Sequence, residues 1–163
     1  MATALIILAA GQGTRMNSDL PKVMHELGGA PLFAHALSAG AALAPERVVL
    51  VAGHGADMVA DAAHKLDPEI EVVVQDEQLG TAHAAQQAQA VLDGFAGDVI
   101  VLYGDTPFIG PETLLTMLAA RADGADVVVL GFEAADPGRY GRLVMQGGRL
   151  DRIVEFKDAG PAE

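Results

Sequence analysis

The chain has 163 residues, which suits one domain that buries most of the surface its unfolded form exposes. Its 22 acidic residues outnumber its 10 lysines and arginines and give a formal net charge of -12, which argues against a general nucleic-acid binder or a protein that binds anionic membranes. The lack of cysteine excludes disulfides, thiolate zinc sites and cysteine nucleophiles. The N-terminal apolar run is only strand-length and follows no basic segment, so we expect no signal peptide, no transmembrane span and a cytoplasmic location.

Short apolar runs alternate with longer alanine-rich stretches, a pattern typical of βαβ units around a mostly parallel sheet. The expected strands are Ala4–Ala9, Arg47–Ala52, Glu71–Gln75, Val99–Leu102 and Asp126–Phe132. The expected helices are Pro31–Leu43, Ala56–Leu66, Thr81–Leu92 and Pro111–Ala122, with each proline in a first turn. The sequence therefore predicts an α/β fold with helices on both faces of the sheet.

The chain changes character after residue 140. Leu143–Gln146 and Arg149–Glu155 flank Gly147-Gly148, which predicts a β-hairpin. The polar tail after it contains no helix or strand pattern, and the hairpin would need further chain to pack against. A complete small domain is one interpretation; we favour a truncated larger protein, so that the single domain 1–163 is incomplete at its C-terminus.

The loop after the first expected strand has the composition of a phosphate-binding loop. Gly11 and Gly13 follow that strand directly, and glycine lets the main chain approach a phosphate and present its N–H groups. Arg15 can bridge phosphate oxygens in a bidentate manner, and Lys22 adds a mobile charge. A turn with two solvated charges explains the bare glycine pattern equally well.

Two common phosphate-binding motifs are excluded. A Walker loop requires Gly-Lys followed by Ser or Thr, which this loop lacks. A dinucleotide-binding fingerprint requires a third glycine where this chain has Met16. The loop therefore belongs to neither class.

Asp105 follows the fourth expected strand in the sequence Tyr103-Gly104-Asp105. Ligands of open α/β sheets bind beyond the carboxyl ends of the strands, so we expect this carboxylate at the same edge as the first loop. Facing a phosphate chain, it can hold Mg²⁺, which takes one or two carboxylates plus phosphate oxygens. The alternative is that Asp105 caps the helix near Pro111 or stabilises a turn.

Two further segments carry candidate ligand contacts. Gln75 has both a carbonyl and an amide group with which to recognise the edge of a base, and Thr81 is the expected N-cap of the helix that follows Gly80. Gly141 permits close approach of a ligand, and Glu155 can accept hydrogen bonds from sugar hydroxyls. A strand edge and a solvated charge explain these last two equally well. His83 has no assigned role, and the five histidines show no metal-binding spacing.

Read together, these segments resemble the uridyltransferase half of the bacterial bifunctional N-acetylglucosamine-1-phosphate uridyltransferase/glucosamine-1-phosphate acetyltransferase family. The first loop alone marks only the broad nucleotidyltransferase superfamily, whereas Glu-Gln-Leu-Gly-Thr-Ala-His with Val-Glu-x-Lys-Asp is more particular. The matching segments span almost the whole chain and are residues 8–16, 18–23, 77–83, 103–107, 140–142 and 153–158.

The resemblance implies a Rossmann-like nucleotidyltransferase domain that converts UTP and N-acetylglucosamine 1-phosphate to UDP-N-acetylglucosamine and pyrophosphate. It implies Mg²⁺ as cofactor, held by Asp105, in-line attack at the α-phosphorus, and Arg15 and Lys22 as the catalytic cations. It assigns nucleotide and substrate contacts to Leu8, Ala9, Ala10, Gly11, Gln75, Gly80, Thr81, Tyr103, Gly104, Gly141 and Glu155. The glycine pattern of the first loop adds Gly13 to these contacts. The product belongs to peptidoglycan synthesis and cell wall biogenesis, and no nucleic acid or membrane is an expected partner.

The family pattern continues past Glu163 with one asparagine that contacts the sugar and another that completes the Mg²⁺ site. We therefore expect much of the UTP site but only part of the sugar and metal sites, and a homotrimer only where the C-terminal β-helix is present. The alternatives are another sugar-1-phosphate nucleotidyltransferase, a molybdenum-cofactor nucleotidyltransferase, or a non-catalytic nucleotide-binding fragment. A molybdenum-cofactor enzyme would start with a Gly-Gly-rich loop and lack the Glu-Gln-Leu-Gly-Thr-Ala-His segment.

Overall fold

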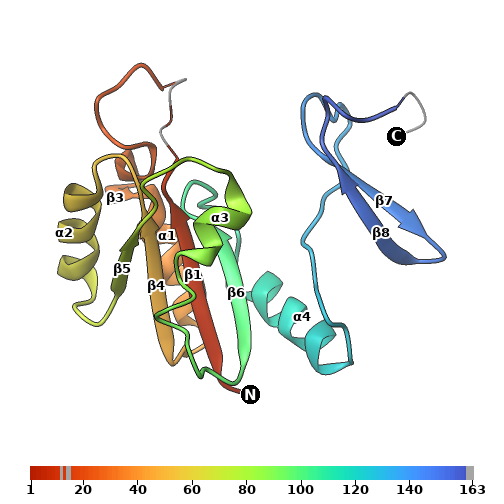
Figure 1. Cartoon of the computed structure of the whole chain (residues 1–163), viewed down its shortest axis with the longest axis horizontal. Helices are drawn as coiled ribbons and strands as arrows, with labels where there is room; N and C mark the ends of the chain where they lie inside the picture. The colour runs from red at the N-terminus through yellow and green to blue at the C-terminus, as the bar shows by residue number, and fades with distance from the viewer. Residues whose placement is uncertain (12, 14–15, 161–163) are drawn as a thin grey trace. The chain divides into compact units, whose positions relative to one another are not determined.

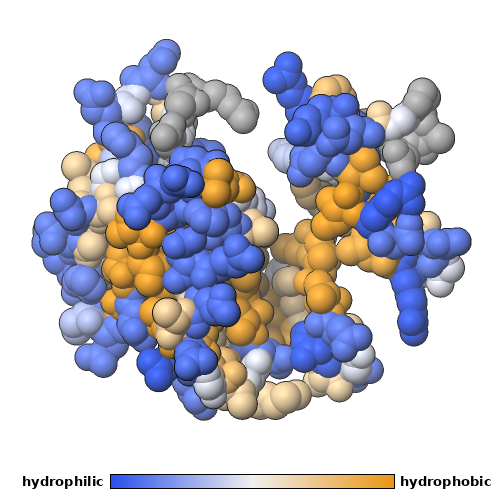
Figure 2. Space-filling view, in the orientation of Figure 1, coloured by the Kyte–Doolittle hydropathy of each residue, from blue (hydrophilic) through white to orange (hydrophobic). Residues whose placement is uncertain are grey.

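The structure is a computed structural model that describes residues 1–11, 13 and 16–160 (Figure 1). The chain forms two compact units, Met1–Asp126 and Val127–Glu163. In the part of the chain that the structure describes, no helix has the length and apolar character needed to cross a membrane. Hydrophilic residues cover most of the visible surface of the first unit, with hydrophobic patches between them (Figure 2).

A four-stranded parallel sheet forms the centre of the first unit. Its strands are β1 (Thr3–Ala9), β4 (Arg47–Ala52), β5 (Glu71–Val74) and β6 (Asp98–Tyr103), in the spatial order β5-β4-β1-β6. All seven residues of β1 are buried, because β1 has a neighbour on each side and helices on both faces. This double burial explains the uninterrupted apolar run at the start of the sequence.

Helices pack on both faces of this sheet, as the sequence predicts. On one face, Leu5 and Ile7 of β1 pack with α1 (Leu32–Ala41), α2 (Ala56–Leu66) and α4 (Pro111–Ala122). On the other face, Ile6 and Leu8 pack with α3 (Thr81–Gln86) and the turns that follow it. Figure 1 shows α3 in front of the sheet and α1 behind it. Alternate residues of one strand thus serve two separate cores, and the α/β class is confirmed.

The order of the strands creates a switch point between β1 and β6. The chain runs outward from β1 to β4 and β5, then returns through α3 to β6 on the other side of β1. The carboxyl ends of β1 and β6 therefore lie side by side at the point where the strand order reverses. Open α/β sheets bind their ligands beyond the strand ends at such a point.

Smaller elements connect these layers. The 3-10 helix η2 (Lys22–Met24) follows the first loop, and β2 (Glu26–Leu27) pairs with β3 (Ala30–Pro31) just before α1. Pro111 occupies the first turn of α4 as predicted, but Pro31 is the N-cap of α1, one residue outside the helix.

Two details of α3 differ from the prediction. The helix ends at Gln86, before Leu92, because the amides of Gln87 and Ala88 bond carbonyls three residues back and convert the helix into turns. Thr81 is the first helical residue and not the N-cap. Gly80 is the N-cap, with φ of 101° and ψ of -179°, a conformation that is accessible to glycine and strained for other residues.

The predicted strand Asp126–Phe132 is wrong. These residues pair with no strand in the described part of the chain, and Val127 and Phe132 are 78% and 69% exposed. The apolar residues of this segment give it a high β-propensity. A strand also needs a hydrogen-bonded neighbour, and the local sequence does not specify that neighbour.

The predicted hairpin of the second unit is confirmed. β7 (Arg142–Gln146) pairs antiparallel with β8 (Arg149–Val154), and Gly147 and Gly148 join them with φ of 57° and 79°. A two-residue hairpin turn of type I′ requires positive φ at both central residues, and a Gly-Gly pair adopts this conformation at low cost.

Candidate functional site

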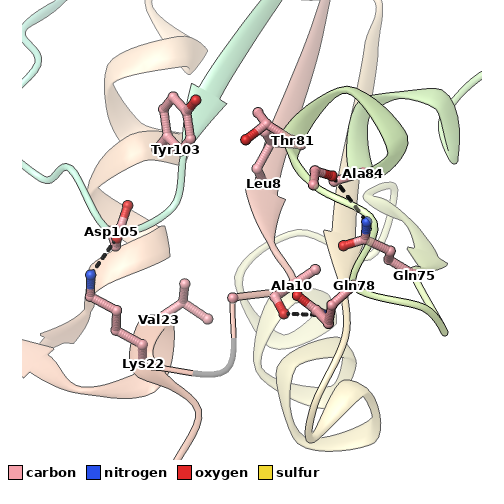
Figure 3. Close-up of a pocket in the computed structure, with 12 residues that line it drawn as sticks. Leu8, Ala10, Lys22, Val23, Gln75, Gln78, Thr81, Ala84, Tyr103 and Asp105 are labelled. Atoms are coloured by element: carbon pink, nitrogen blue, oxygen red, sulfur yellow. Dashed lines mark hydrogen bonds and ion pairs between the residues drawn. The ribbon is translucent and has the colours of Figure 1, made fainter. Parts of the chain in front are cut away.

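A pocket of about 210 Å³ opens at the carboxyl ends of β1 and β6 (Figure 3). Its walls come from the end of β1, from η2, from the segment between β5 and α3, and from the end of β6. Its lining residues are Leu8, Ala10, Gly11, Lys22, Val23, Gln75, Gln78, Gly80, Thr81, Ala84, Tyr103 and Asp105. The pocket therefore lies at the switch point of the sheet.

The floor of the pocket is held in place by close backbone packing. The amide of Gly104 donates a hydrogen bond to the Leu8 carbonyl at 2.9 Å, and a Cβ on Gly104 would lie 3.1 Å from that oxygen. Gly53, which follows β4, packs even more tightly, because a Cβ there would lie 2.7 Å from the Ala10 carbonyl oxygen. Ala9, between the lining residues Leu8 and Ala10, turns its side chain into the opposite core.

A lysine and a carboxylate face each other at one end of the pocket. The Lys22 Nζ lies 2.5 Å from the Asp105 Oδ2, although the two residues are 83 positions apart, and their side chains are 38% and 30% exposed. Gly13, with φ of 59°, allows the first loop to pass close to this lysine, because a Cβ there would lie 2.7 Å from the Lys22 Cβ.

Asp105 does not cap α4. The N-cap of that helix is Gly110, which receives no side-chain cap. The alternative that Asp105 serves as a helix cap is therefore excluded. Its carboxylate is directed to the pocket and to Lys22 (Figure 3). Asp105 and Lys22 are the charged side chains among the described residues that line the pocket.

Side-chain amides form the other end of the pocket. Gln75 is 4% exposed, and its Nε2 donates to the Gly80 carbonyl at 3.2 Å and lies 2.9 Å from the His83 Nδ1. The Gln78 Nε2 donates to the Ala10 carbonyl at 2.9 Å. This bond joins the segment after β5 to the loop after β1, so the two sides of the pocket are linked.

Most of the residues expected from the sequence line this one pocket: Leu8, Ala10, Gly11, Lys22, Gln75, Gly80, Thr81, Tyr103 and Asp105. Ala9, Gly13 and Gly104 lie behind the lining and support it. Gly141 and Glu155 belong to the second compact unit, and Arg15 lies outside the described residues.

Three lining residues have no assignment from the sequence: Val23, Gln78 and Ala84. Val23 and Gln78 fall inside the segments 18–23 and 77–83 that carry the family resemblance. The sequence therefore pointed to these segments but not to these two residues. Ala84 is three positions after Thr81 on α3, and helical spacing places both on the same side of that helix.

The described residues contain no group of three or more His, Asp and Glu side chains that would hold a metal alone. Asp105 supplies one carboxylate at the pocket, with part of its surface open. This donor set suits a hard divalent cation that takes most of its oxygen ligands from a bound phosphate chain.

Comparison with known proteins identifies relatives that match the chain over its whole length. The chain is 68% identical over all 163 residues to the bifunctional protein GlmU of Dinoroseobacter shibae and 64% identical to that of Ruegeria sp. strain TM1040. In both cases the chain spans 36% of the relative's length, about a third. The resemblance that the motifs indicate is confirmed.

A solved structure supports the fold. The chain is similar to HddC from Yersinia pseudotuberculosis in complex with GMP-PN, with a TM-score of 0.71 and 25% identity over 93% of this chain and 68% of that one. The sequence model described as "MobA-like NTP transferase domain" matches residues 5–158. The chain therefore belongs to the family of MobA-like NTP transferase domains.

Proposed function

We propose that the pocket binds UTP, and that the chain is the part of a nucleotidyltransferase that forms UDP-N-acetylglucosamine and pyrophosphate from UTP and N-acetylglucosamine 1-phosphate. The observation that carries the proposal is the division of this single pocket, with the Lys22–Asp105 pair at one end and the buried Gln75 amide at the other. A nucleoside triphosphate has the same division, with charge at one end and a polar base edge at the other.

The phosphate end needs cations and N–H groups. Lys22 is a mobile point charge, and the main chain at Gly11 is free of a side chain that would block a phosphate. Its partner Asp105 keeps the ammonium group in the pocket. We propose that Arg15 adds a second cation, as the family resemblance implies.

Asp105 is the proposed protein ligand of Mg²⁺, together with phosphate oxygens of the nucleotide. When bound, the metal neutralises the charge that develops on the leaving pyrophosphate. The contribution of the chain is to hold the carboxylate at the carboxyl end of β6, where Gly104 fits against β1 and fixes the direction of the loop.

The reaction needs no nucleophile from the protein. An oxygen of the sugar phosphate attacks the α-phosphorus in line, its bond to phosphorus forms, and the bond to pyrophosphate breaks. The residues of the pocket contribute orientation and charge neutralisation, the two effects that dominate phosphoryl-type transfer. The resemblance assigns the sugar to Gly141 and Glu155 of the second unit. The proposal keeps the cytoplasmic location expected from the sequence.

Two measurements test this proposal. Titration calorimetry of the chain with UTP, CTP, GTP and dTTP in the presence of Mg²⁺ should show tightest binding of UTP. A pyrophosphate-release assay with UTP and N-acetylglucosamine 1-phosphate separates a catalyst from a binding fragment. Binding of UTP without turnover would support a nucleotide-binding fragment, and preference for another nucleotide would overturn the choice of base.

A further inference from the structure

We propose that His83 is a positioning residue that holds the Gln75 side-chain amide with its oxygen toward the pocket, and thereby favours a pyrimidine whose ring N3 carries a hydrogen. This inference rests on the proposed function, because it names how the same pocket distinguishes UTP from CTP. It assigns a role to the histidine for which the sequence offered none.

The orientation of the Gln75 amide follows from its two contacts. The same atom, Nε2, lies 3.2 Å from the Gly80 carbonyl oxygen and 2.9 Å from the His83 Nδ1. A carbonyl oxygen can only accept, so the atom near it must be the NH₂ group and not the amide oxygen. Turning the amide over would bring two acceptors together. Each hydrogen of Nε2 therefore has one partner.

The protonation of His83 follows in turn. Since Nε2 of Gln75 donates to it, the ring Nδ1 must carry a lone pair, and the neutral ring holds its proton on Nε2. Gln87 lies one helical turn further, and its Nε2 donates to the His83 main-chain oxygen at 3.0 Å. The 3.3 Å approach of the same amide nitrogen to the ring Nε2 is then a contact between two N–H groups.

The remaining atom of the Gln75 amide is the one that meets the ligand. Gln75 lines the pocket, and Figure 3 shows its oxygen on the side that faces the pocket interior. Among the described residues none donates a hydrogen bond to this oxygen. An accepting oxygen is therefore presented to whatever base enters.

The chemistry of the two pyrimidines makes this selective. N3 of uracil carries a hydrogen and donates to an accepting oxygen, whereas N3 of cytosine carries a lone pair and would face that oxygen as a second acceptor. Without the His83 acceptor, Gln75 keeps one of its two restraints and the amide can turn to offer its NH₂ group. Loss of His83 should therefore reduce discrimination more than it reduces binding itself.

The experiment compares His83→Leu, which removes the acceptor, with His83→Asn, whose amide oxygen can replace Nδ1. Calorimetry with UTP and with CTP, each with Mg²⁺, gives the ratio of the two dissociation constants. We expect His83→Leu to lower the preference for UTP about tenfold, the size of one hydrogen bond lost and one repulsion relieved. We expect His83→Asn to restore most of that preference.

The matched control is His64→Leu. The His64 Nε2 lies 3.1 Å from the Ile70 carbonyl oxygen, and neither residue lines the pocket. This variant should lower stability without changing the UTP to CTP ratio. Nitrogen NMR of the protein with labelled histidine reports which ring nitrogen of His83 carries the proton. The wild type gives the measurement, and the signal that is missing from His83→Asn identifies His83. The expected tautomer carries its proton on Nε2.

The outcomes separate the two proposals. Equal weakening of UTP and CTP by His83→Leu, or no change in either, would overturn the positioning role while UTP binding by the wild type still supports the proposed function. A proton on Nδ1 of His83 would also overturn it. Failure of the wild type to bind any of the nucleotides would overturn both.

Discussion

Replacement of Gly53 by alanine should both destabilise the fold and weaken nucleotide binding. A Cβ at this position would lie 2.7 Å from the Ala10 carbonyl oxygen and 3.0 Å from the Ala10 Cα and Cβ. Ordinary contact begins at 3.4 Å, so the backbone at Ala10 must move by several tenths of an ångström. Ala10 lines the pocket, and its carbonyl accepts the 2.9 Å hydrogen bond from Gln78.

The expected magnitudes follow from these contacts. Overpacking against a backbone that cannot rotate away costs about 1–3 kcal/mol of unfolding free energy. That cost corresponds to a melting temperature lower by roughly 3–10 °C for a unit of this size. Loss of the hydrogen bond from Gln78 weakens UTP binding about fivefold, since one such bond contributes about 1 kcal/mol.

Thermal unfolding by circular dichroism and calorimetry with UTP and Mg²⁺ measure the two effects. Gly110→Ala is the matched control, because a Cβ there would meet only the end of the flexible Glu112 side chain, at 3.0 Å, and Gly110 does not line the pocket. The control should leave both the melting temperature and the UTP affinity close to those of the wild type. If Gly53→Ala behaves in the same way as the control, the close contact between residue 53 and Ala10 does not hold the pocket in place.

Two further substitutions separate stability from function, and another two compare a buried with an exposed ion pair. Lys22→Met should weaken UTP binding about 10- to 100-fold, which is the contribution of one charge-assisted hydrogen bond. It should lower the unfolding free energy by less than about 1 kcal/mol, because the Lys22–Asp105 ion pair is partly exposed. Calorimetry measures the first effect and thermal unfolding the second. Asp105→Asn should reduce turnover by about 10²–10³ in a pyrophosphate-release assay with an unchanged melting temperature, and near-normal turnover would contradict its role. Arg121→Met should lower the unfolding free energy by about 1–3 kcal/mol, because its partner Asp98 is 8% exposed and loses its counter-charge. Arg47→Met, at an exposed ion pair, should change the unfolding free energy by less than about 0.5 kcal/mol. Urea titrations measure both changes.

The sequence by itself determined the layers of the fold and the edge at which the pocket forms. Apolar runs of strand length and alanine-rich runs of helical length are local patterns. They specify the four strands of the parallel sheet and α1, α2 and α4 to within two residues at each end, whereas α3 ends six residues before its predicted end. Parallel strands must end at the same edge, so residues that directly follow two strands, such as Gly11 and Asp105, were expected together and line one pocket.

Local backbone conformation was beyond the reach of the residue pattern. Thr81 has the side chain of a capping residue, but Gly80 takes the N-cap because the chain enters α3 with positive φ. The apolar run Asp126–Phe132 has the composition of a strand and forms none, because pairing depends on a second segment.

The partners of the pocket side chains were decided only by the tertiary structure. The Lys22–Asp105 pair spans 83 positions and the Gln78–Ala10 bond spans 68, and no local pattern encodes which groups meet over such separations. The orientation of the Gln75 amide and the proton position on His83 depend on a few ångströms between three groups. The sequence placed the glycine-containing first loop at the carboxyl edge of the parallel sheet. Folding decided which donor and acceptor atoms line the pocket, because hydrogen bonds are set by distance and direction and not by residue order.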